Sequence, residues 1–199
     1  MSTREPQFVI NNSNFEKKNF SNQNRNFSLI SKSKFFNCSF EYTLLKETKL
    51  NDVIFKDCDL TGVVLRSSEF RNVEFNNCKM GKSQFISGVF KNTSIIDSTC
   101  NDIKIRGSYF NNSEIVNSDF SNSDLNRVIF ENSKLCDVKF FNCKMFMFFS
   151  INVYFKNVKF KNSNLTLSKF VNCKKNNSPL GQNNKLLCLF EKNVTTEVE

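Results

Sequence analysis

The sequence predicts an all-β protein in which a five-residue unit repeats and winds into a square solenoid. A large apolar residue recurs at every fifth position from Phe15 to Phe170; 30 of these 32 positions are apolar, the exceptions being Arg25 and Ser150. A small or β-branched residue stands two positions before most of them, and no insertion or deletion interrupts the series. A period of five fits neither the 3.6-residue period of a helix nor continuous strand alternation.

The unit small-x-large-x-x explains how the chain turns. Three residues of local alternation point one small and one large side chain inward, and the next two residues turn the chain through one corner. Four units close a square coil, so residues 20 apart lie in one column. With coils stacked ~4.8 Å apart, about eight coils make a rod of roughly 40 Å. Each buried Phe or Leu contributes about 1.5–3 kcal/mol, so the rod needs neither helix nor disulfide.

This pattern resembles the pentapeptide-repeat family, whose units centre on Leu or Phe with Ala, Ser, Cys, Thr or Val two residues earlier. Ser33 before Phe35 and Cys58 before Leu60 are examples in this chain. The resemblance extends over most of the sequence, and it implies a right-handed quadrilateral β-helix.

The expected organisation has a β-helix between two caps. It consists of an N-terminal cap and start of the first coil at residues 1–14, the β-helix at 15–175, and a C-terminal cap and tail at 176–199. Phe8 and Ile10 already keep the small-x-large register. Beyond Asn176 the repeat is lost, Ser178–Gly181 is typical of a turn, and Leu186–Phe190 predicts an apolar lid or a dimer contact.

Composition argues against catalysis. The chain has no histidine, the commonest general base and metal ligand, and no Gly-rich phosphate loop. A coil filled with Phe leaves no interior substrate pocket, and we expect no cleft between Asp57 and Asp59, on opposite sides of a corner. We therefore predict no enzyme activity, cofactor, metal or small-molecule substrate.

The eight cysteines recur at repeat positions, which favours reduced thiols. Cys38, Cys58 and Cys78 share an inward column; a soft-metal ladder is one interpretation, and small buried core residues are the favoured one. The sequence shows neither an 18-residue apolar run nor a signal peptide, so the expected location is cytoplasmic.

The corner residues form columns along the rod. Asn and Asp suit a corner because they tolerate the left-handed backbone region. One corner column alternates, as Asn37, Asp57, Asn77, Asp97, Asn117, Asp137 and Asn157. The alternation predicts Asn amides bridging carboxylates that would otherwise repel. Another of the four corners, the third, lacks any such ladder. Its residues are Glu47, Ser67, Ser87, Gly107, Arg127, Met147 and Leu167.

Positive charge gathers on the face before that third corner and at the C-terminal end. The face carries six cations against two anions, whereas residues 138–190 hold nine lysines and no acid within a chain of net charge +9. A basic surface suggests an anionic partner, although a solvated basic face is an equally weighted interpretation.

One irregularity in the repeat lies in the same region. Phe148 stands at a small position and Ser150 at a large one, a swap that conserves core volume. Phe146, Met147 and Phe149 would then face outward, unless a local bulge buries some of them. The predicted binding residues, for a protein or an anionic partner, are Arg66, Arg106, Arg127, Lys144, Phe146, Met147 and Phe149.

These observations predict a non-enzymatic, rigid protein-interaction surface, with a homodimer through the C-terminal segment as an alternative contact. The family resemblance implies two further functions. Some members protect DNA gyrase and topoisomerase IV from quinolones or toxins with an acidic, dimeric rod that resembles duplex DNA, a pattern from which a net charge of +9 departs. Other members are secreted effectors, and the resemblance to them implies a scaffold that binds a membrane or a host protein.

Overall fold

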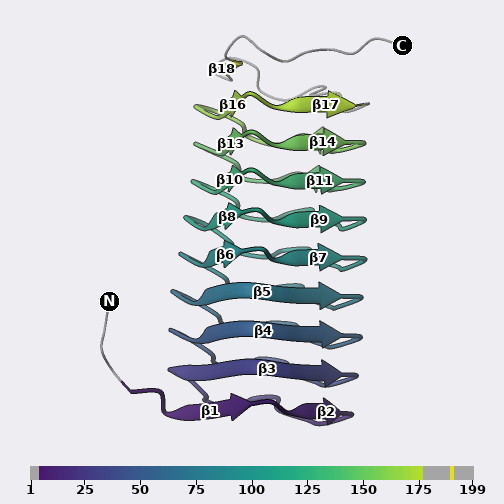
Figure 1. Ribbon diagram of the computed structural model, residues 1–199. Helices are drawn as coiled ribbons and strands as arrows, with labels where there is room; N and C mark the ends of the chain where they lie inside the picture. The colour runs from purple at the N-terminus through teal and green to yellow at the C-terminus, as the bar shows by residue number, and fades with distance from the viewer. Residues whose placement is uncertain (1–4, 177–188, 191–199) are drawn as a thin grey trace.

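The computed structural model describes residues 5–176 and 189–190 as an all-strand parallel β-solenoid of about eight turns (Figure 1). In Figure 1 the foreground strands run from left to right while the chain rises from its N-terminus, so the winding is right-handed. The predicted fold class is confirmed. Within the described ranges no helix could span a membrane.

Each coil has four faces, which we number by their large inward residues. These run from Phe15 to Phe155 on the first face, Phe20 to Phe160 on the second, Arg25 to Leu165 on the third and Ile10 to Phe170 on the fourth. Each corner takes the number of the face that it follows.

Regular strands concentrate on the fourth and first faces. The fourth face holds β1 (Phe8–Asn11), β6 (Val89–Lys91), β8 (Tyr109–Asn111), β10 (Ile129–Glu131), β13 (Phe149–Ile151), β16 (Lys169–Val171) and β18 (Leu189–Phe190). The first face holds β2 (Asn14–Glu16), β7 (Ser94–Ile96), β9 (Glu114–Val116), β11 (Lys134–Cys136), β14 (Tyr154–Lys156) and β17 (Lys174–Asn176). Three longer strands cover both faces: β3 (Ser28–Phe36), β4 (Lys49–Lys56) and β5 (Glu69–Asn76). The second face holds β12 (Lys139–Phe141) and β15 (Lys159–Lys161).

Strand pairing keeps one register along the rod. Every named pair is parallel and joins residues 20 apart, as where Ile30 faces Leu50 and Phe35 faces Phe55. The core rings therefore stack in columns. The ring centroids of Phe70, Phe90, Phe110 and Phe130 follow one another at 4.3, 4.2 and 4.5 Å. This stack is the one that the five-residue series predicts.

Every corner uses the left-handed backbone conformation. Each fifth residue from Asn12 to Asn172 has a positive φ, between +45° and +69°. Asn and Asp visit this region at lower cost than other side chains, which explains their columns at three of the corners. In the first corner, Asn Nδ2 donates to the Asp Oδ1 of the preceding coil, at 2.6 Å for Asn77 to Asp57 and 2.8 Å for Asn117 to Asp97.

Buried serines at the small positions have a backbone partner. The hydroxyl of Ser98 accepts from the Cys78 N–H at 3.1 Å, and that of Ser168 accepts from the Phe148 N–H at 3.1 Å. Each N–H belongs to the same position one coil earlier. A small polar residue thus satisfies a backbone donor that apolar packing would leave unpaired.

Arg25, one exception to the apolar series, closes the N-terminal end of the core. Its guanidinium carbon lies 5.1 Å from the ring centroid of Phe8 and 6.0 Å from that of Phe20, and its Nε donates to Gln23 Oε1. Because this end faces solvent, the Arg stem covers apolar rings while its charge reaches water.

At the other end, β18 continues the fourth face. Lys169 pairs with Leu189, and Phe170 pairs with Phe190. The remainder of the predicted Leu186–Phe190 contact, and the whole Ser178–Gly181 turn, lie outside the described residues.

Candidate interaction surface

The residues selected from sequence lie on the third face, on its corner and at the start of the fourth face. We call this set the third-corner surface: Arg66, Arg106, Arg127, Lys144, Phe146, Met147 and Phe149. The four cations are exposed, and the three apolar side chains are half-buried. Arg106, Arg127 and Lys144 form no salt bridge with any described residue.

Backbone contacts hold the apolar members in regular positions. The Phe146 N–H donates to Asn126 Oδ1 at 2.9 Å, and the Met147 N–H donates to the Thr166 carbonyl at 3.0 Å. Phe149 lies in β13, paired with Ile129 of β10 and Lys169 of β16. The strand register runs through this segment without interruption, so the bulge interpretation is wrong.

The exchange between Phe148 and Ser150 is why no bulge forms. Both side chains are fully buried, and the Phe148 ring lies 5.6 Å from Phe130 and 6.1 Å from Phe170 between centroids. One large residue from the small position thus fills the space that Ser150 leaves open. Ser150 Oγ has no hydrogen-bond partner among the described residues.

The third corner is the only one of the four without Asn or Asp at its described positions. Its long side chains still take the left-handed conformation, with φ of +58° at Arg127, +54° at Met147 and +59° at Leu167. Leu167, outside the set selected from sequence, is 40% exposed and extends the apolar area by one coil. Reading the corner column alone would have found it.

Arg66 lies apart from the C-terminal members of the surface. It occupies the same outward column as Arg106 and Phe146, four coils before Phe146. Its Nε donates to Gln84 Oε1 at 3.0 Å. The structure therefore brings Arg106, Arg127 and Lys144 near the aromatic residues, and leaves Arg66 at the far end of the face.

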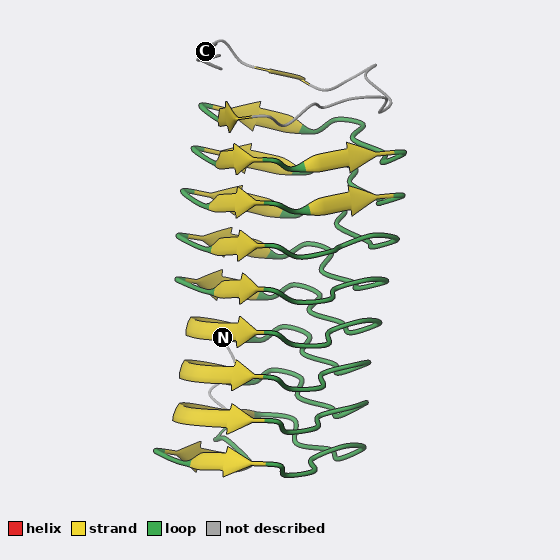
Figure 2. Ribbon diagram, turned by 90° about the vertical axis from the view of Figure 1, so that its right-hand side faces the viewer, coloured by secondary structure: helices red, strands yellow, loops and turns green. Residues whose placement is uncertain are grey.

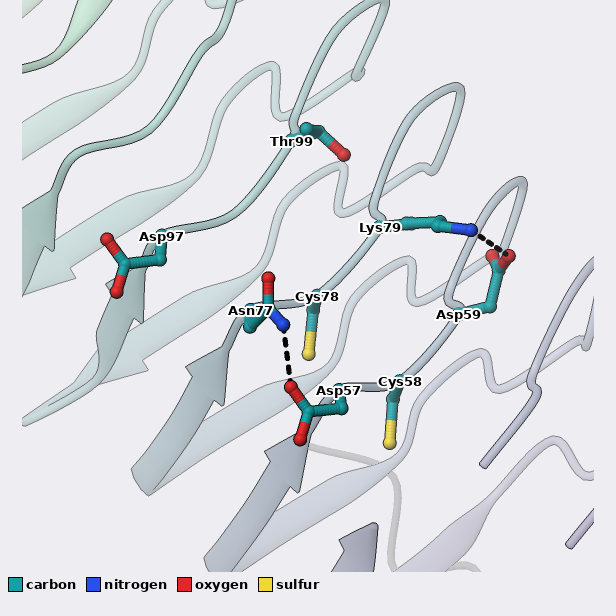
Figure 3. A pocket seen from close by; sticks show the side chains of 8 residues that line it. All are labelled: Asp57, Cys58, Asp59, Asn77, Cys78, Lys79, Asp97 and Thr99. Atoms are coloured by element: carbon teal, nitrogen blue, oxygen red, sulfur yellow. Dashed lines mark hydrogen bonds and ion pairs between the residues drawn. The ribbon is translucent and has the colours of Figure 1, made fainter. Parts of the chain in front are cut away.

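A pocket of about 300 Å³ opens where the first and second faces meet (Figure 3). Its lining residues are Asp57, Cys58, Asp59, Asn77, Cys78, Lys79, Asp97 and Thr99. The expectation of no cleft between Asp57 and Asp59 is wrong, because both residues line this pocket and their side chains point apart.

The carboxylates of this pocket already have partners. Asp57 Oδ1 accepts from Asn77, and Asp59 Oδ2 lies 4.0 Å from the Lys79 amine (Figure 3). No group of three or more potential metal ligands occurs in the described part of the chain. The pocket is therefore a weak candidate for acid–base chemistry.

The stacked thiols beneath the pocket point into the core. The Cys58 thiol donates to the carbonyls of Phe35 and Lys56, both at 3.3 Å. A hydrogen bond with Cys58, together with burial, raises the pKa of Cys78, and burial raises the pKa of Cys38. The same hydrogen bond lowers the pKa of Cys58. All three thiols are buried and donate to backbone carbonyls, which supports the packing interpretation over a metal ladder.

Solved structures of other proteins resemble this architecture. A trypsin-treated variant of QnrB1, a plasmid-mediated fluoroquinolone resistance protein, is 15% identical over 93% of this chain and 91% of that chain, with a TM-score of 0.51. HetL, a pentapeptide repeat protein involved in heterocyst differentiation regulation in Nostoc sp. strain PCC 7120, is 10% identical over 90% and 91%, with a TM-score of 0.46. At 15% identity the likeness to the QnrB1 variant concerns the fold alone.

The sequence itself matches descriptions of one family, although no curated protein matches it. "Pentapeptide repeat region" matches residues 7–85 and 28–105, and "Pentapeptide repeats (8 copies)" matches residues 103–140. Together these matches extend over residues 7–140, more than half of the chain, and the same five-residue unit forms every described coil. The chain therefore belongs to the pentapeptide repeat family.

Proposed function

We propose that this protein is a non-enzymatic rod that binds a protein partner through the third-corner surface. The observation that carries the proposal is the choice of residues at the third corner. Arg127, Met147 and Leu167 hold a backbone conformation that costs an ordinary side chain about 1–2 kcal/mol, although Asn or Asp occupies the other corners of the same coils. At the other corners such side chains occur singly, as at Lys32, Tyr42 and Lys82, whereas the third corner has them in three successive coils. Strained backbone is characteristic of functional sites.

The chemistry of the surface suits a protein interface. Half-buried Phe146, Met147 and Phe149 lie beside Arg127 and Lys144, which have no salt bridge among the described residues. Aromatic and Arg side chains are the usual anchors of interfaces, and contact would bury the exposed parts of these rings. The basic rim favours a partner whose apolar patch is bordered by acidic residues.

Affinity capture with matched variants tests the proposal. Phe146 and Phe149 are changed to Ser together, and Phe36 and Tyr154, half-buried outward aromatics of the first face, are changed to Ser as the control. We expect a partner from extracts of the source cells to be retained by the parent and the control and lost by the Phe146/Phe149 variant. Equal recovery by all three folded proteins would exclude the surface.

Sedimentation of the same proteins separates a foreign partner from self-association. If the surface joins two copies, the parent and the control sediment as dimers and the Phe146/Phe149 variant sediments as a monomer. A parent that is monomeric at all concentrations leaves the foreign partner as the proposal. A homodimer through Leu186–Phe190 would instead survive the double substitution.

Topoisomerase protection is a second candidate, suggested by the fold likeness to QnrB1. The net charge of +9 gives no support to a rod that imitates acidic duplex DNA. A gyrase supercoiling assay with and without a fluoroquinolone decides the matter. Restored supercoiling in the presence of the drug would favour this candidate, and unchanged inhibition would exclude it.

A further inference from the structure

Two lysines of the rod are paired along the coil axis with an acid in the same column. Lys134 Nζ lies 2.8 Å from Glu114 Oε1, and Lys79 Nζ lies 4.0 Å from Asp59 Oδ2. In each pair the acid stands 20 residues earlier, one coil below. Opposite charges across neighbouring strands stabilise a sheet, and like charges in the same arrangement destabilise it.

In its last two described coils the second face instead places like charges opposite one another, as Arg71 and Lys91 lie on the fourth face. In β12 and β15, the two strands at the upper right of Figure 2, Lys139 pairs directly with Lys159 and Phe141 pairs with Lys161. The three lysines are exposed and the Phe141 ring is half-buried among them. We call Lys139, Phe141, Lys159 and Lys161 the lysine face.

The acids that border the lysine face make hydrogen bonds to neutral side chains and no salt bridge to its lysines. Asp119, one coil below Lys139, accepts hydrogen bonds from the Ser121 N–H at 2.9 Å and from the Ser121 hydroxyl at 2.5 Å. Asp137, at the adjoining corner, accepts from Asn157 Nδ2 at 2.9 Å. No lysine of the face forms a salt bridge with a described residue, and exposed Lys144 and Lys156 flank it. Asp119 lies opposite Lys139 across the strands, so it offsets part of the repulsion between Lys139 and Lys159 without forming a salt bridge.

We propose that the lysine face binds single-stranded nucleic acid, with phosphates along the lysines and a base stacked on Phe141. By the usual strand spacings, the Cα atoms of Lys159 and Lys161 are ~6.6 Å apart along one strand, and those of Lys139 and Lys159 are ~4.8 Å apart across strands. A row of cations beside an aromatic ring is the arrangement that holds single strands without sequence preference.

Two other polyanions fit the lysine face less well. A bilayer would contact the side of the rod more widely, and earlier coils carry Asp59 and Asp119 in the same column as Lys139. A duplex keeps its bases stacked, so it would leave Phe141 without a role. The lysine face lies on a different side of the rod from Phe146 and Phe149, and the proposal does not rest on the third-corner surface.

Fluorescence anisotropy of a labelled single-stranded oligothymidine with the full chain tests the proposal. The variant changes Lys139, Lys159 and Lys161 to Gln. A charge-matched control changes Lys49, Lys56 and Lys91 to Gln, all exposed on other parts of the rod. About three phosphate contacts give a slope of roughly −2 in log affinity against log salt, or about a twentyfold loss from 50 to 200 mM salt. We expect the variant to flatten this slope and the control to keep it.

Two further proteins address the stacking and the charge. Phe141→Leu should lower affinity for the single strand by about fivefold or more without changing the salt slope, and should leave duplex binding unchanged. Replacing the three lysines with Arg should retain binding, because the charge is kept. Equal losses in variant and control, tighter binding to a duplex of the same length, or preferential binding to vesicles containing phosphatidylserine would each overturn the proposal.

Discussion

Replacing the third corner with Asn should stabilise the rod while it removes the proposed interface. The perturbation is Arg127→Asn, Met147→Asn and Leu167→Asn in one protein. At the equivalent fourth corner, Asn152 has the same φ of +54° as Met147, and its Nδ2 donates to Asn132 Oδ1 at 3.1 Å. The substituted corner should gain the same conformational ease and the same side-chain bond between coils.

The magnitude follows from the backbone and from the burial that is lost. A left-handed residue costs about 1–2 kcal/mol, part of which Asn avoids, so three corners recover about 2–3 kcal/mol after the loss of the half-buried Met147 packing. For a chain of this length each kcal/mol raises Tm by about 2–4 °C. The expected rise in Tm is therefore about 5–10 °C.

Calorimetry and urea unfolding measure the change. The reverse substitution, Asn152→Met, is the control in the same coil and should lower the free energy of unfolding by about 1 kcal/mol. The reasoning that the third corner is less stable than an Asn corner would be refuted by two results together. The triple variant would unfold at or below the parental Tm, and Asn152→Met would leave the free energy of unfolding unchanged.

Three other predictions concern the ladder, the core and the thiols. Asn117→Asp places a carboxylate between Asp97 and Asp137 and removes a 2.8 Å hydrogen bond, so stability should fall by about 2 kcal/mol at low salt and recover partly at 1 M salt; equal loss at both salt concentrations would argue against stacked charges. Phe148→Ala should cost about 3–5 kcal/mol in urea unfolding, whereas the swap Phe148→Ser with Ser150→Phe should cost under about 1.5 kcal/mol; similar losses in both would show that Phe148 does not fill the space of the column. Burial raises the pKa of Cys143 from 9.0 to about 11, so the stability that the protonated thiol contributes is complete below pH 9 and is lost as pH rises toward 11. The free energy of unfolding of the parent should therefore fall by up to about 3 kcal/mol more over this range than that of a Cys143→Ser protein. Parallel pH profiles of the two proteins would contradict this prediction.

The five-residue period determined the architecture because the residues of each unit are enough to specify how the chain turns there. A large inward residue, a small one two positions earlier and a corner residue able to take a positive φ specify one turn of the chain, and identical turns must stack. This local rule explains why the columns from Phe70 to Phe130 and from Asn77 to Asp137 could be predicted in register. The predicted function, binding residues and cytoplasmic location stay predictions, since exposed side chains impose no such rule.

Contacts between coils were decided only by the tertiary structure. Phe148 fills the space left by Ser150 because Phe130 and Phe170, one coil away on either side, define that space; the sequence left a bulge as an alternative. The pocket beside Asp57 and Asp59 depends on the directions in which two side chains leave a corner, which a periodic pattern does not contain. Periodicity places a residue in a column, whereas its charge balance, its hydrogen-bond partner and the space beside it depend on the residues 20 positions away, which stacking alone brings into contact.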